Sequence, residues 1–152
     1  MLVQLALVAL ALLVSLVITR QYLMARVDDR IDATLTQEVD EFRALAQTGI
    51  DPVTRAPFDD PRRLLQLHLQ RSIPQTNETL IGLVDGVPVS RVAQEPPARL
   101  DLDPDAVAAF AAAQDTRTGQ VRTERGVVTY RVVAVLVEGS TTRGALGVGV
   151  FR

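Results

Sequence analysis

The chain of 152 residues contains no cysteine, which excludes several kinds of structure at once. Without thiols, neither a disulfide framework nor a thiolate metal site can form. If part of the chain faces an oxidising compartment outside the cytoplasm, its apolar core alone must therefore stabilise it.

Lysine and tryptophan are also absent, and there is a single histidine. All 16 basic residues are arginine, and 18 acidic residues bring the formal net charge to −2. A chain so close to neutrality lacks the basic surface that nucleic acid requires, so we expect no nucleic-acid partner. The exclusive use of arginine, with abundant Ala, Val, Leu, Asp and Pro, is typical of bacterial genomes of high GC content.

The residues that usually carry out catalysis are scarce. His68 lies between Leu67 and Leu69 on a predicted helix, with no acid–base partner beside it. None of the serines stands in a Gly-x-Ser-x-Gly sequence, and no glycine-rich phosphate loop is present. We therefore expect no catalytic residue in this chain, and we interpret His68 as a partly buried structural residue.

Helix-breaking residues are missing from the whole N-terminal third, since no Gly or Pro occurs between Leu2 and Thr48. From Leu2 to Thr19 no residue is charged, and a transmembrane helix needs roughly 20 mostly apolar residues. A cleaved signal peptide is the alternative, but bulky residues stand at 18–22, where a peptidase needs small ones. The sequence thus predicts an uncleaved transmembrane helix over residues 1–19.

The charges that flank this segment leave its orientation open. Arg20, Arg26 and Arg30 all follow it, and the positive-inside rule applied to them places the rest of the chain in the cytoplasm. However, Met1 directly precedes the apolar run, so a short basic leader could be missing from the start.

An apolar stripe continues the helical pattern over residues 20–48. Its members are spaced mostly four residues apart, and acidic residues occupy the other face. Gly49 is suited to end the helix. The transmembrane segment and residues 20–48 should therefore form one continuous helix. The spacing exceeds the 3.5 residues of a heptad zipper, so we expect the stripe to pack on its own domain, with pairing into a homodimer on an adjacent face. The stripe comprises Leu23, Val27, Ile31, Leu35, Val39 and Phe42.

The pattern of helix starts, turns and apolar runs over residues 49–152 predicts a small α/β domain. Asp60-Pro61 and Asp103-Pro104 are typical of helix starts, and Asp85-Gly86 is typical of a tight hairpin turn. The connections favour a five-stranded antiparallel sheet with helices on one face, an α+β fold. The small residues Ala145, Gly147 and Gly149 share one face of the last strand, where we expect the long helix to pack closely. The predicted helices are 61–72 and 104–113, and the predicted strands are 79–84, 87–92, 119–124, 127–138 and 145–151.

Two polar patterns in this domain are candidate sites. Asp101, Asp103 and Asp105 alternate as in a calcium loop, but the glycine and glutamate that such a loop needs at its sixth and twelfth positions are absent. Capping of a helix by Asp103 is the better interpretation, and we expect no metal and no cofactor.

The second pattern consists of polar residues on predicted strands. Arg91, Tyr130 and Arg131 could hold a small anion through charge-assisted hydrogen bonds. A solvated or ion-paired arginine is the alternative. By strand alternation, Tyr130 shares a face with Val128 and Val132, whereas Arg131 falls on the opposite face.

Several stretches resemble the N-terminal sensor region of actinobacterial two-component sensor histidine kinases. They are "RVDDRIDATLTQEVDEFRALA", "GIDPVTRAPFDD", "LLQLHLQRSIP", "NETLIGLVDGVP" and "RGALGVGVF". The resemblance implies a PAS-like or Cache-like domain outside the cytoplasm, followed in the parent protein by a second membrane helix, a HAMP linker and a histidine kinase core.

This resemblance also implies a function. The chain would be the input half of the kinase, anchored in the cell membrane, and an unknown small ligand or extracytoplasmic protein would shift the domain. The long helix would carry that shift into the lipid bilayer. Two other classes remain open at this point, namely a membrane-anchored interaction module without a kinase and, less favoured for lack of catalytic groups, an anchored hydrolase.

Overall fold

The computed structural model describes residues 2–151 and contains the expected order of elements. Three helices and five strands follow one another as helix, helix, two strands, helix and three strands, which confirms the order that the sequence predicts. The elements are α1 (Leu2–Thr48), α2 (Pro61–Arg71), β1 (Glu78–Val84), β2 (Val87–Arg91), α3 (Pro104–Ala111), β3 (Arg117–Thr123), β4 (Gly126–Val135) and β5 (Gly144–Phe151).

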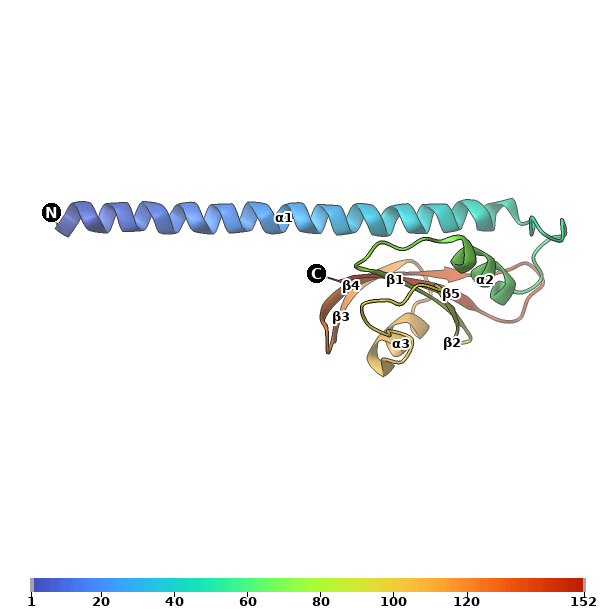
Figure 1. The fold of residues 1–152 in the computed structure, drawn as a ribbon. Helices are drawn as coiled ribbons and strands as arrows, with labels where there is room; N and C mark the ends of the chain where they lie inside the picture. The colour runs from blue at the N-terminus through green and yellow to red at the C-terminus, as the bar shows by residue number, and fades with distance from the viewer. Residues whose placement is uncertain (1, 152) are drawn as a thin grey trace. The chain divides into compact units, whose positions relative to one another are not determined.

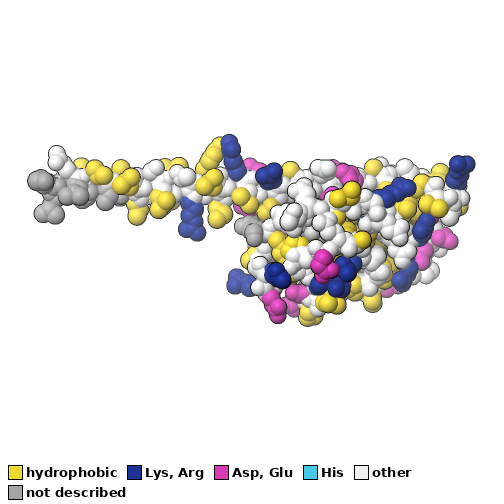
Figure 2. Space-filling model, viewed as in Figure 1, with side chains coloured by type: hydrophobic (Ala, Val, Ile, Leu, Met, Phe, Trp, Pro, Cys, Tyr) yellow, Lys and Arg dark blue, Asp and Glu magenta, His cyan; other side chains and the backbone are white. Residues whose placement is uncertain are grey.

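The chain divides into two compact units, and the boundary falls inside α1, between Thr34 and Leu35. The first unit is helical. Its side chains from Leu10 to Ile18 are exposed, and Figure 2 shows hydrophobic side chains along this part of the helix. By length and composition, α1 could cross a membrane.

The second unit, residues 35–152, is built on one antiparallel sheet with the strand order β2-β1-β5-β4-β3. The central strand β5 pairs with β1 on one side and β4 on the other, and it is buried along its whole length. This arrangement confirms the α+β class and the five-stranded antiparallel sheet.

The last turns of α1 pack on one face of this sheet. Leu35, Val39 and Phe42 are at most 1% exposed. Thr36 accepts a 2.6 Å hydrogen bond from Arg131 of β4, and the Phe42 ring meets the His68 ring of α2 edge-on at 5.0 Å. From Leu35 onward, the stripe therefore packs on its own domain, as predicted.

Helices cover both faces of the sheet, so the prediction that they lie on one face is wrong. The short helix α3 lies on the side opposite the last turns of α1 (Figure 1). Its Phe110 meets Tyr130 of β4 edge-on at 5.0 Å. The reason is that β1, β4 and β5 are apolar on both faces, and each face needs a cover.

The small residues of β5 also face a different partner from the one predicted. A Cβ added at Gly147 would lie 2.8 Å from the Phe110 ring, and one at Gly149 would lie 3.0 Å from Leu100. Ala145 belongs to the same apolar cluster. The small residues thus make room for the aromatic ring of α3, while Leu146 and Val148 point toward the α1 face.

Local signals in the sequence set most element boundaries. Asp60 caps α2 by accepting from the backbone N–H of Arg62, and Asp103 caps α3 in the same manner. Asp85 and Gly86 both have positive φ, as the predicted hairpin turn requires. Gly49, at φ +64°, ends α1.

Leu35→Ala should destabilise the second unit by about 2–5 kcal/mol, because it leaves a cavity at a fully buried position. Val27→Ala, in the same stripe but 44% exposed, is the matched control and should change stability by less than about 0.5 kcal/mol. Urea unfolding of the chain across a dilution series measures both. A loss that appears only at concentrations where the chain dimerises would contradict packing within one chain.

Gly147→Ala should cost about 1–3 kcal/mol because its Cβ would displace the Phe110 ring. The same unfolding assay applies. Phe110→Leu in the Gly147→Ala background should recover part of this loss, since it removes the overlapping ring atoms. Equal losses with and without Phe110 would show that the close contact is not the cause.

Candidate functional site

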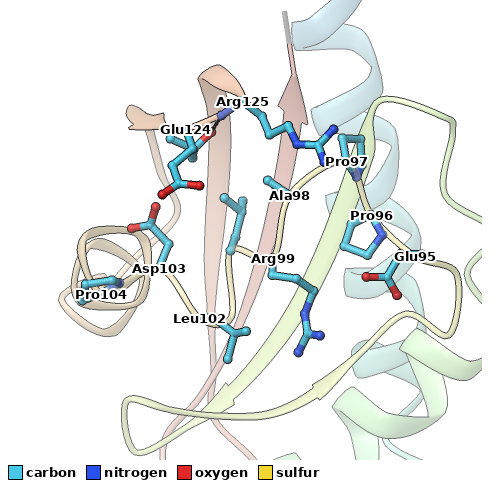
Figure 3. Close-up of a pocket in the computed structure, with 12 residues that line it drawn as sticks. Glu95, Pro96, Pro97, Ala98, Arg99, Leu102, Asp103, Pro104, Glu124 and Arg125 are labelled. Carbon is cyan, nitrogen blue, oxygen red and sulfur yellow. Dashed lines mark hydrogen bonds between the residues drawn. The ribbon is translucent and has the colours of Figure 1, made fainter.

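A groove of about 520 Å³ opens on the α3 side of the sheet. Two segments far apart in the sequence line it, the loop Glu95–Pro104 and the β3–β4 turn at Thr123–Arg125 (Figure 3). Pro96 and Pro97 fix the backbone on one side of the opening. The groove is therefore a preformed depression and does not depend on a flexible loop of glycines.

A bidentate ion pair holds the loop that forms this groove. Arg99 donates from Nε to Asp101 Oδ1 at 2.8 Å and from Nη2 to Oδ2 at 2.6 Å. These hydrogen bonds hold the pKa of the Asp101 carboxyl below its usual range. Arg91 lies beside the pair, with its Nη2 3.9 Å from the Glu95 carboxylate.

The other charged side chains that line the groove include both acidic and basic ones. Carboxylates of Glu95, Asp103 and Glu124 line it, and the Arg125 side chain makes no hydrogen bond or ion pair within residues 2–151. In Figure 3 the Arg125 guanidinium extends toward Pro97. Such a surface suits a ligand or a protein segment that carries both charges.

The three residues predicted to bind an anion do not form one site. Arg91 belongs to the charged network beside the groove. Tyr130 is buried beneath Phe110 on the same face of the sheet, on a strand separated from β2 by β1 and β5. Arg131 points to the opposite face, where it donates to Thr36 and Thr118. The strand alternation predicted from the sequence is confirmed, and it keeps Tyr130 and Arg131 apart.

A second group of polar side chains lies on the α1 face of the sheet, and sequence reasoning missed it. Glu78 of β1 is 2% exposed and Thr129 of β4 is 8% exposed. Glu38 of α1 is half-buried. One oxygen of each side chain is buried without a hydrogen-bond partner. The available signal was an acid next to the stripe residue Val39 and another at the start of an otherwise apolar strand.

Burial dominates the electrostatics of this group. It raises the pKa of Glu38 to about 7, and the negative charges of Glu78 and Glu41 add to the effect. Burial also raises the pKa of Glu78, although a 3.0 Å hydrogen bond from the Gln75 backbone N–H opposes the increase.

His68 is buried, as expected, and packs against Phe42. Burial lowers its pKa, so the imidazole is neutral at neutral pH. Within residues 2–151, no three His, Asp or Glu side chains are grouped so that they could hold a metal ion. Comparison with protein-family models, curated proteins and solved structures finds no match to the chain.

Asp101→Asn should loosen the loop 95–104, because it replaces the charged partner of Arg99 with a neutral amide. Faster backbone hydrogen exchange in that loop would measure the effect. Since the folded-state pKa of Asp101 is depressed, the wild-type stabilisation is present above the unfolded pKa and disappears as the pH falls through the folded value. Glu124→Gln, across the groove, should leave exchange in the loop unchanged.

Proposed function

We propose that the chain is the extracytoplasmic input region of a membrane-bound sensor histidine kinase. The observation that carries this proposal is the course of α1. One helix begins in a segment apolar enough to cross a membrane and ends as a buried element of a sheet domain. A change in the packing of that domain therefore acts on the helix that enters the bilayer.

The direction of β5 supports the same proposal. Thr36 contacts Arg131, which is the register partner of Val148. Six residues further along α1, Phe42 shares a cavity with Val133, the partner of Leu146. Within the second unit, β5 thus runs antiparallel to the end of α1 and approaches the point where that helix enters. In this proposal, a segment following β5 would begin at the end of the sheet unit where α1 enters it.

Signalling would proceed as a shift between two packing arrangements of the domain. A ligand or partner that prefers one arrangement changes its population, and α1 carries the difference into the membrane. A long helix before a five-stranded antiparallel sheet fits the PAS-like or Cache-like assignment. In this proposal the chain itself carries no catalysis, and the kinase core belongs to the parent protein, which acts as a homodimer.

A membrane-anchored interaction module without a kinase is the alternative function. The groove favours an interaction module, because it is open and is lined by both acidic and basic side chains, as protein-binding surfaces are. The coding sequence downstream of residue 152 distinguishes the two, since only a sensor kinase requires a second membrane helix and a kinase core there.

Fusions after Arg152 test the orientation. If residues 28–152 lie outside the cytoplasm, an alkaline phosphatase fusion should be active and a reporter that works only in the cytoplasm should be inactive. Activity of the cytoplasmic reporter alone would place the domain inside the cell and overturn the proposal.

Ala25→Pro tests transmission through α1. Proline in a helix interior costs about 3 kcal/mol locally and interrupts α1 between its apolar segment and the sheet unit. We expect signalling by the full-length protein to fall while the sheet domain remains folded by circular dichroism. Ala25→Ser, which keeps the backbone N–H, should signal normally. Unchanged signalling with proline would show that α1 does not transmit.

A further inference from the structure

The interface between α1 and the sheet contains acidic groups that the proposed function does not use. Glu38 reaches it from α1 and Glu78 from β1, and Glu78 pairs in register with Val150 of the α1 face. Thr129 pairs with the same Val150 from the other side. The helix therefore covers a row of buried polar atoms, three of which have no hydrogen-bond partner.

One oxygen of Glu38 and one of Glu78 are buried without a hydrogen-bond partner, although the other Glu78 oxygen accepts from the Gln75 N–H. Negative charge on such groups is unfavourable, and a second negative charge nearby increases the cost. Protonation resolves both problems, because it removes a charge and supplies a donor.

We propose that Glu38 holds a proton that keeps residues 35–48 of α1 docked on the sheet near Glu78, and that loss of this proton loosens the docking. The proposal concerns the packing of the domain, so it stands whether or not the chain belongs to a kinase.

The charged groups around the pair are consistent with this assignment. From α1, Glu41 adds negative charge and accepts a 3.0 Å hydrogen bond from Gln37. From α2, the neutral His68 supplies no compensating cation. From β4, Arg131 donates to Thr36 and Thr118. The β5 residues on this face, Leu146, Val148 and Val150, are apolar and do not titrate.

The expected pH dependence follows from the raised pKa of Glu38. An acid whose folded-state pKa exceeds its unfolded value stabilises the docked state fully below the unfolded value, near 4.5, and loses that contribution as the pH rises through about 7. The equilibrium constant for local opening of 35–48 should therefore increase from pH 5 to pH 8 by roughly fifty- to a hundredfold.

Hydrogen exchange of the full chain in detergent tests this, with each rate divided by the intrinsic exchange rate at its pH. Wild type should lose protection in 35–48 between pH 5 and pH 8. Glu38→Gln, which cannot ionise, should keep its pH 5 protection at pH 8. Asp40→Asn, at an exposed position of the same helix, is the control and should lose protection as wild type does.

A second measurement does not depend on any variant. Carboxyl ¹³C NMR of glutamate-labelled wild-type chain should show one buried group titrating near pH 7, and this signal should be missing from Glu38→Gln. Titration of every glutamate near its ordinary value, or pH-independent protection in wild type, would overturn the proposal. Protection at pH 8 that returns only with added Mg²⁺ or Ca²⁺ would also overturn it, in favour of a cation site.

Discussion

The burial of three side chains near the end of α1 is the contact on which the other features depend. Leu35, Val39 and Phe42 are fully buried where the last turns of α1 join the sheet domain. Burying such side chains contributes about 1.5–3 kcal/mol each, whereas a helix without tertiary contacts gains little from propensity. The stripe therefore both stabilises the domain and makes α1 responsive to it.

This contact also explains why acids are buried there. A helix that turns Leu35 and Val39 toward the sheet also brings Glu38, one turn after Leu35, to the edge of the same interface. Glu78, at the start of β1 and in register with Val150 of β5, is close enough for its charge to act on Glu38. The unfavourable burial of these carboxyls weakens the docking as the pH rises, so the interface is tunable and not maximally stable.

The sequence predicted features that depend on neighbours along the chain, and it failed where distant segments meet. Caps at Asp60 and Asp103, the turn at Asp85-Gly86 and the alternation of Tyr130 and Arg131 are local, and all are confirmed. Which helix covers which face depends on the order of strands in the sheet, which no spacing encodes. The loop 95–104 and the turn 123–125 form a groove for the same reason, so the candidate site could not be found from either segment alone.

The groove lies on the α3 face of the sheet and the last turns of α1 pack on the opposite face, so a direct coupling between them would cross the sheet (Figure 1). Strand β5 is suited to transmit it. Gly147 touches Phe110 of α3 on one face, while the adjacent residues Leu146 and Val148 point to the α1 face. Since side chains alternate along a strand, a displacement of β5 caused by movement of Phe110 must also move the surface on which α1 packs. The absence of a Cβ at Gly147 brings the ring into direct contact with the strand backbone, where such a displacement is transmitted most directly.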